Sequence, residues 1–240
     1  MDVSFLITTF NSSKFLNKSI NSCLNQRNHS LNFEIIIIND GSTDDTDKIL
    51  SEYNSKKIKI FKTKNSGIEK SINLSFKMSS GDYLIRVDAD DYLEQNFLLS
   101  IQKFLNKSNF FYTNYSLVSE DEKLIRKVKL PKFDTQEIEE RGDFMATGTI
   151  YHKSFIKKFG GYNTRFKNCG LENYEFILKL LSNNIKGCLI PLNLVNYRRH
   201  SNNMSDEKRN SIINHGKKIA KFYNLKEYKT NKNHPYGLII

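Results

Sequence analysis

Residues 83–91 read Tyr83-Leu84-Ile85-Arg86-Val87-Asp88-Ala89-Asp90-Asp91, an apolar run followed by three carboxylates within four positions. Carboxylates this close together repel one another, so the cluster is costly unless a cation or a basic group compensates it. A strand that ends in aspartates offers the hard oxygen ligands that Mg²⁺ and Mn²⁺ prefer. Because open α/β sheets bind ligands at the carboxyl ends of their strands, the stretch predicts such a sheet with a ligand at this edge. An aspartate-rich turn that caps a helix is the alternative for the stretch taken alone.

The residues before this cluster alternate between strand and helix patterns. Apolar runs predict strands over residues 3–8, 33–38, 58–61 and 83–87. Between them, apolar residues recur every three or four positions, which is typical of amphipathic helices. Repeated strand–helix–strand units imply right-handed crossovers and parallel strands. We therefore predict an α/β fold in which a Rossmann-like, mostly parallel sheet is flanked by helices.

The pattern loosens after residue 91. A further strand is predicted over residues 110–115, a hairpin or loop over the Lys-rich residues 119–141, and a helix over residues 173–181. From residue 205 onward the chain is basic, with apolar residues at roughly helical spacing. This segment predicts either an amphipathic helix lying on a membrane or a helix docked on the main domain.

The positive charge is concentrated in the second part of the chain. The net charge is +11, yet residues 1–100 carry 12 Lys and Arg against 13 Asp and Glu. An anionic partner of the later residues is therefore expected: a phosphorylated substrate, an anionic membrane surface or nucleic acid. A solvated basic face without a partner is the alternative. Because the basic residues are not interleaved with aromatic ones, nucleic acid is the least favoured partner.

Targeting signals and cysteine spacing favour a cytoplasmic protein. The first residues lack a basic and apolar leader pattern, and no apolar run approaches the ~18 residues that a membrane span requires. The three cysteines, Cys23, Cys169 and Cys188, are isolated from one another. Isolated cysteines in odd number fit a reducing compartment, where they serve as small apolar residues.

Short polar stretches follow the first two predicted strands as well. These are Thr8-Thr9-Phe10-Asn11 and Asn39-Asp40-Gly41-Ser42. Because parallel strands share the edge at their carboxyl ends, both stretches are expected beside Asp88–Asp91, where they could hydrogen-bond a nucleobase and a ribose. The acidic cluster would then hold a metal ion on a diphosphate. The second stretch alone is also typical of an ordinary turn before a helix.

Further stretches appear in a fixed order along the chain, and the whole set resembles family 2 of the glycosyltransferases, which have the GT-A fold. Beside those already quoted, the stretches that carry the resemblance are Val3–Asn11, Ile36–Asp44, Asn65–Asn73, Gly81–Asp91, Gly160–Asn163, Leu171–Glu175 and Tyr197–Asn203. The family usually has Pro where Thr8 stands. The match implies a GT-A domain over residues 1–205, with a nucleotide-sugar half at 1–91 and an acceptor half at 92–205, and a basic tail at 206–240.

The resemblance also implies an activity. Members of this family type transfer a sugar with inversion from a nucleotide-diphosphate donor, here expected to be a UDP-sugar, with Mn²⁺ or Mg²⁺ as cofactor. The implied acceptor is a glycan or a polyprenyl-diphosphate-linked glycan of a bacterial surface polysaccharide. Contact with the inner, anionic face of the cell membrane fits such an acceptor and the basic second part.

Roles are carried over residue by residue from the family's motifs. Thr9, Asn11 and Asp40 would cradle the base and the ribose. Lys70 and Arg86 would place positive charge near the diphosphate or balance the carboxylates. A second set concerns the metal ion: Asp88 would contact the ribose or the metal shell, Asp90 would ligate the metal ion, and His200 would close over the phosphates or complete the metal shell.

One departure from the family concerns the catalytic base. The family has Glu-Asp where this chain has Glu172-Asn173, and that aspartate is the usual base. An inverting transfer needs a carboxylate to take the proton of the acceptor hydroxyl, which Asn173 cannot do. Either Glu172 serves as the base, or the acceptor supplies its own nucleophile, or the protein binds a nucleotide sugar without turning it over.

Two other classes of function compete with a transferase. A catalytically impaired module that binds a nucleotide sugar or a glycan would explain Asn173. A nucleotidyltransferase shares the carboxylates at the sheet edge, but it normally needs a Gly-rich, basic phosphate loop near the first strand, which residues 8–14 lack.

Overall fold

Four parallel strands form the first part of the sheet in the computed structural model, which describes residues 2–27, 30–141 and 147–225. β1 (Val3–Thr9) lies between β2 (Phe33–Asn39) and β4 (Tyr83–Asp88), and β3 (Ile58–Lys62) pairs with the far side of β2. Every residue of β2 is buried, as expected of a strand covered on both faces. The strands predicted before residue 91 are therefore confirmed.

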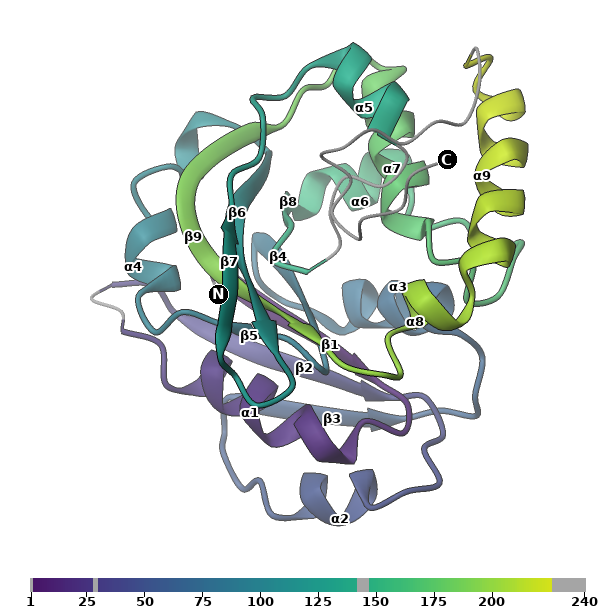
Figure 1. The fold of residues 1–240 in the computed structure, drawn as a ribbon. Coiled ribbons are helices and arrows are strands. Elements are labelled where there is room, and N and C mark those ends of the chain that lie inside the picture. Colours follow the sequence, from purple (N-terminus) through teal and green to yellow (C-terminus); the bar gives the residue numbers. More distant parts are fainter. Residues whose placement is uncertain (1, 28–29, 142–146, 226–240) are drawn as a thin grey trace.

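Helices connect these strands and cover the sheet (Figure 1). They are α1 (Ser13–Leu24), α2 (Thr46–Ser51) and α3 (Ile68–Met78). In α1 the buried residues are Leu16, Ser19, Ile20 and Cys23, which lie on one stripe of the helix. The amphipathic patterns read from the sequence thus mark the faces that pack on the strands.

The second part of the chain extends the same sheet. Its strands are β5 (Tyr92–Leu93), β6 (Phe110–Ser119), β7 (Leu124–Val128), β8 (Ile150–His152) and β9 (Cys188–Arg199). The strand order is β3-β2-β1-β4-β8-β6-β9-β5, with β7 paired to β6 beside this path. β8 runs antiparallel to β4 and to β6, so the sheet as a whole is mixed. Strands as short as β5 and β8 are too short to show a hydrophobic period in the sequence. The sequence therefore does not predict their antiparallel pairing.

The helical elements between these strands are short. They are α4 (Phe97–Ile101), the 3₁₀ turn η1 (Leu105–Lys107), α5 (Thr135–Arg141), α6 (Lys153–Phe159) and α7 (Glu172–Leu181). The Lys-rich residues 119–141 contain the β6–β7 turn, β7 and α5, so the predicted hairpin is confirmed.

The basic segment after residue 205 docks on the body. α8 (Met204–Glu207) leads into α9 (Arg209–Phe222), whose residues Ile212, Ile219 and Ala220 are buried. Of the two predicted alternatives, α9 is therefore the helix docked on the main domain. The prediction of an amphipathic helix lying on a membrane is wrong for α9. The remainder of the predicted tail, residues 226–240, lies outside the described residues. Within the described ranges, no helix has both the length and the apolar character to cross a membrane.

The buried carboxylate of Glu34 connects β1, β3 and the residues that follow α3. Glu34 in β2 accepts hydrogen bonds from the Ser4 hydroxyl (2.7 Å) and from the backbone N–H of Ser80, and it pairs with Lys59 at 2.7 Å. Burial alone would raise the pKa of Glu34, but the hydrogen bonds from Lys59, Ser80 and Ser4 lower it to about 2. The ionised carboxylate therefore stabilises the folded state.

We expect Glu34→Gln to lower the free energy of unfolding by about 2–3 kcal/mol at pH 7, because one pKa unit corresponds to about 1.4 kcal/mol. The folded pKa lies below the unfolded value of 4.5, so this stability is complete above pH 4.5 and is lost as the pH falls toward 2. The difference between the variant and the parent should close across that window in urea titrations. The exposed Glu52→Gln is the matched control, and equal stabilities of Glu34→Gln and the parent at pH 7 would contradict the assignment.

Candidate functional site

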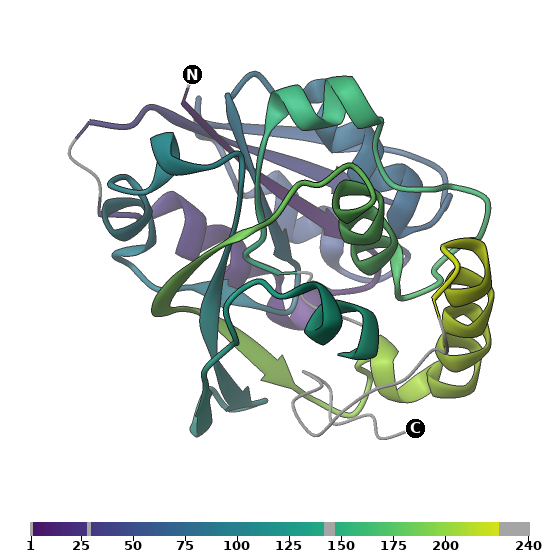
Figure 2. The same cartoon turned by 90° about the horizontal axis from the view of Figure 1, so that it is seen from above.

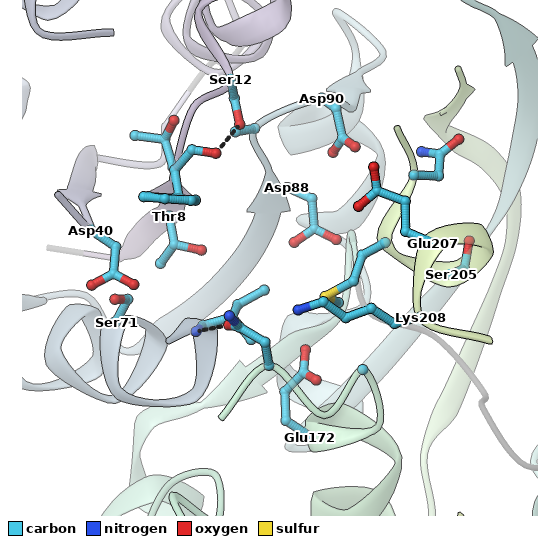
Figure 3. Close-up of a pocket in the computed structure, with 18 of the residues that line it drawn as sticks. Thr8, Ser12, Asp40, Ser71, Asp88, Asp90, Glu172, Ser205, Glu207 and Lys208 are labelled. Atoms are coloured by element: carbon cyan, nitrogen blue, oxygen red, sulfur yellow. Dashed lines mark hydrogen bonds between the residues drawn. The ribbon is translucent and has the colours of Figure 1, made fainter. Parts of the chain in front are cut away.

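A cavity of about 500 Å³ opens at the carboxyl ends of β1 and β4 (Figure 3). Its walls also include the start of α3, the start of α7 and the segment from the end of β9 to α9. The residues of the predicted site that line it are Thr9, Asp40, Arg86, Asp88, Asp90 and Glu172. Those that do not are Asn11, Lys70, Asn173 and His200.

The ends of β1 and β2 meet at this edge, as parallel strands require. Thr9 is buried and lines the cavity, and its hydroxyl has no hydrogen-bond partner among the described residues. Asn11 lies just outside and ties the two loops together, because its side-chain oxygen accepts from the Thr43 N–H at 2.8 Å. Thr9 thus offers a hydroxyl to a ligand, whereas Asn11 shapes the loops.

Asp40 holds the loop that leads into α3. One of its carboxylate oxygens accepts from the Ser66 N–H (2.9 Å) and the Thr63 hydroxyl (3.0 Å), and the other accepts from the Gly67 N–H (2.8 Å). Gly67 has φ +97, and a Cβ there would lie 2.6 Å from the Lys167 side chain. The carboxylate therefore fixes the wall of the cavity as well as lining it.

Lys70 lies outside the cavity, although the sequence places it near the diphosphate. Ile68 and Ser71 of α3 line the cavity, whereas Lys70 is exposed on the same helix. Successive helical residues point in directions about 100° apart, so neighbours cannot all face one cavity. The structure does not bring Lys70 to the carboxylates.

Arg86 joins two carboxylates at the floor of the cavity. Its Nε lies 2.7 Å from Asp88 Oδ1, and its Nη1 lies 2.7 Å from Glu172 Oε1. Arg86 and Glu172 are each only 3% exposed. Burial alone would lower the pKa of Arg86, but the charges of Asp88 and Glu172 raise it well above its usual value. A permanently charged guanidinium thus connects the acidic cluster to the start of α7.

The three aspartates of the cluster point in different directions. Asp88 and Asp90 line the cavity. Asp91 is 1% exposed and accepts from the Arg198 N–H at 2.8 Å, so it anchors the end of β9 instead. Burial, and then repulsion from Asp90, raises the pKa of Asp88, although the charge of Arg86 opposes the rise. Burial, and then repulsion from Asp90 and Asp88, raises the pKa of Asp91.

Asp88 and Asp90 are the residues that could hold a divalent cation. Their side chains are 21% and 30% exposed, and both present carboxylate oxygens to the cavity. Burial first, and then the charge of Asp90, raise the pKa of Asp88, and a cation bound there would stabilise its ionised form. The donor set therefore fits Mg²⁺ or Mn²⁺.

His200 lies against Asp90 behind the cavity wall. Its Nε2 is 3.1 Å from Asp90 Oδ2, and its ring packs on Phe15 with centroids 4.7 Å apart. The Asn202 N–H donates to Nδ1 at 3.2 Å, so the proton of a neutral ring lies on Nε2 and points at Asp90. His200 is thus positioned to orient Asp90 in this arrangement.

Glu172 and Asn173 face different surroundings at the start of α7. Glu172 Oε2 is buried at the cavity and has no hydrogen-bond partner among the described residues. Asn173 is turned away, and its side-chain oxygen accepts from the hydroxyls of Tyr151 (2.9 Å) and Tyr162 (2.7 Å). Asn173 therefore acts in the core, and grouping it with the catalytic residues does not fit its position.

The sequence did not point to the segment that closes the cavity on the side of α8. Glu207 and Lys208 line the cavity there and lie near Asp88, Asp90 and Glu172 in Figure 3. No sequence pattern marks Glu207 and Lys208, because one acidic and one basic residue in a polar stretch are typical of a solvated helix end. Their position depends on how α9 docks.

Comparison with known proteins agrees with this architecture. The model of glycosyl transferase family 2 matches residues 4–170. The chain is 29% identical over 185 residues to an uncharacterized glycosyltransferase of Haemophilus influenzae, covering 75% of this chain and 71% of that protein. It is 36% identical over 134 residues to an uncharacterized glycosyltransferase of Rickettsia bellii, covering 55% of this chain but only 19% of that protein.

A solved structure shows the same fold. The crystal structure of TarS 1-349 of Staphylococcus aureus in complex with UDP-GlcNAc matches 95% of this chain and 67% of that chain, with a TM-score of 0.76 and 19% identity. TarS is a poly(ribitol-phosphate) β-N-acetylglucosaminyltransferase. The predicted α/β fold of GT-A type is confirmed by this match. Since the family model covers most of the chain, the protein belongs to glycosyltransferase family 2.

Proposed function

We propose that this protein is a metal-dependent, inverting glycosyltransferase that moves a sugar from a UDP-sugar to a glycan or lipid-linked acceptor. The observation that carries the proposal is the chain of ion pairs Asp88–Arg86–Glu172 in one cavity. The Arg86 guanidinium lies between Asp88, one of the carboxylates suited to a cation, and Glu172, whose Oε2 has no hydrogen-bond partner among the described residues. The complex of TarS with UDP-GlcNAc supports the choice of donor.

The residues of the chain divide the chemistry between them. Glu172 Oε2 takes the proton of the acceptor hydroxyl while that oxygen forms a bond to the anomeric carbon, and the bond to the diphosphate breaks with its electron pair on the leaving group. Attack from the face opposite the leaving group inverts the anomeric carbon. Arg86 holds Glu172 Oε1, whereas Oε2 is buried and has no hydrogen-bond partner among the described residues. A divalent cation on Asp88 and Asp90 would supply Lewis-acid stabilisation of the leaving diphosphate.

We propose that different parts of the chain bind the donor and the acceptor. We assign donor binding mainly to residues 1–91 and acceptor binding mainly to residues 92–205. A polyprenyl-diphosphate-linked acceptor at the inner, anionic face of the cell membrane fits the basic second part. This would place the protein in the cytoplasm, in contact with that membrane.

A module that binds a nucleotide sugar without turnover is the competing function. The presence of Asn173 in place of the usual base supports such a module. However, Asn173 accepts hydrogen bonds from Tyr151 and Tyr162, and the neighbouring Glu172 lines the cavity instead. Donor hydrolysis or transfer by the purified protein would exclude the module. Binding of UDP with Mn²⁺ but neither hydrolysis nor transfer, with any acceptor fraction, would favour it.

The donor site is tested by calorimetric titration of UDP, GDP, dTDP and CMP, with Mn²⁺ and with EDTA. We expect UDP to bind with Mn²⁺ and to bind at least tenfold more weakly with EDTA. Asp90→Asn should weaken binding with Mn²⁺ by about 10- to 100-fold, because it removes one charged oxygen ligand. The same variant should change binding in EDTA by less than about threefold, because the cation is then absent.

Asp82→Asn is the matched control for this titration. Asp82 is an exposed aspartate that directly precedes β4, whereas Asp90 follows the other end of that strand. The control should bind UDP like the parent. Equal loss of affinity in both variants would show a general charge effect, and absence of binding by all four nucleotides would refute the donor site.

A further inference from the structure

One strongly positive exposed element of the described chain is the strand β7 with the residues that flank it. Residues 123–132 hold five cations and no carboxylate. We name these cations the β7 basic strip: Lys123, Arg126, Lys127, Lys129 and Lys132. All five are exposed, and none forms a salt bridge to a described carboxylate. Their charge is therefore available to a partner.

Two of the three carboxylates of the neighbouring β6–β7 turn are neutralised from the other side. Glu120 pairs with Lys14 of α1. Glu122 pairs with Lys18 of α1 and with Arg198 of β9. These pairs fix the turn to the body, while Asp121 is the one exposed carboxylate of the turn for which the described residues show no ion pair.

Two aliphatic residues of the same strand are also exposed. Leu124 is 58% exposed and Ile125 is 54% exposed. The pairing of β6 with β7 passes from Leu117–Arg126 to Val118–Leu124, so Ile125 is the extra residue of a bulge. A bulge re-aims a side chain, and residues 124–127 of β7 are all exposed, so the strand meets solvent on both of its faces. The hairpin that carries them projects from the body in Figure 2.

We propose that the β7 basic strip binds the surface of an anionic lipid bilayer, with Leu124 and Ile125 entering the headgroup layer. Lysines on an edge strand also prevent edge-to-edge pairing, but a protected edge has no need of two exposed aliphatic residues. A soluble polyanion would satisfy the cations and leave the aliphatic pair in water. An anionic bilayer matches both, because it offers negative headgroups above an apolar layer.

The strip is linked to the site through Arg198. Its Nη1 donates to the Glu120 carbonyl at 2.7 Å in the β6–β7 turn, and its Nε donates to the Asp90 carbonyl at 2.9 Å. Docking of the hairpin would therefore hold the acidic cluster close to the bilayer. This gives the proposed function a route to a lipid-linked acceptor, and only that step rests on the proposed function.

Flotation of the full chain with vesicles tests the surface. We use vesicles of phosphatidylcholine with about 30% phosphatidylglycerol, and vesicles of phosphatidylcholine alone, at low and high salt. The parent should float with the anionic vesicles only. The variant K123Q/R126Q/K127Q/K129Q should bind at least tenfold more weakly, because one basic residue near an anionic surface contributes roughly fivefold to binding. L124S/I125S should bind about three- to tenfold more weakly at equal charge.

The control variant K48Q/K56Q/K77Q/K157Q removes the same charge from exposed lysines elsewhere. It should keep more than half of the parent's affinity for vesicles. The proposal is overturned if the control loses as much as the strip variant, if L124S/I125S binds like the parent, or if the parent binds polyphosphate but not anionic vesicles. UDP titration of the same samples needs no vesicles, so a failure of the donor site and a failure of this surface are told apart.

Discussion

Replacing Glu172 by Gln is expected to lower the rate of sugar transfer by about 10²- to 10⁴-fold, the usual contribution of a general base. Gln cannot take the acceptor proton, yet its amide oxygen can still accept from Arg86, which lies 2.7 Å from Glu172 Oε1 in the parent. UDP affinity should therefore stay within about threefold of the parent. Single-turnover kinetics with a radiolabelled UDP-sugar, together with calorimetry, measure the two effects separately.

Asn173 supplies the control for this experiment. Asn173→Asp restores the residue that the family usually has, but its side chain would lie between the hydroxyls of Tyr151 and Tyr162 and away from the cavity. We expect it to change the rate by less than about threefold. A rise of more than tenfold in Asn173→Asp, or unchanged turnover in Glu172→Gln, would move the base away from Glu172.

Replacing Arg86 by Met is expected to lower the free energy of unfolding by about 3–5 kcal/mol, because it leaves the buried Glu172 and the partly exposed Asp88 without their charged partner. For a domain of this size the loss corresponds to a fall in Tm of roughly 10 °C or more. Arg86→Lys keeps the charge but loses the fork that reaches both carboxylates, so its effect should be intermediate. Urea unfolding followed by circular dichroism measures the series.

A double-mutant cycle separates the ion pair from simple loss of packing. Glu172→Met should be less harmful in the Arg86→Met background than in the parent, with a coupling energy of about 1–3 kcal/mol. Arg27→Met, a change at an exposed arginine, is the control and should stay within about 0.5 kcal/mol of the parent. Additive effects of the two changes would refute the coupling.

These two predictions concern one physical unit. Arg86 extends from the strand that presents the acidic cluster, and Glu172 begins the helix that faces it, 86 positions later in the chain. Because both side chains are almost completely buried, their attraction is little screened by water. The guanidinium thus sets the distance between Asp88, which we propose as a ligand of the cation, and Glu172, which we propose as the acceptor of the proton.

Much of this site could be predicted from local sequence. Asp40, Asp88 and Asp90 follow the ends of apolar strands, and parallel strands bring such ends to one edge. Lys70 and Asn173 could not be placed in this way, because their direction depends on the rotation of α3 and α7 about their axes. A sequence motif names both neighbours on a helix, but here Ser71 and Glu172 line the cavity and their neighbours Lys70 and Asn173 do not.

The sequence by itself determined the strands and helices of the first part, the family and the acidic edge, because apolar period and strand-end chemistry are local properties. The tertiary structure decided which carboxylates share the cavity, that Arg86 bridges Asp88 and Glu172, and that α9 docks while β7 stays exposed. Those features depend on contacts between segments distant in the chain. Such contacts follow from packing and burial, which no local pattern encodes.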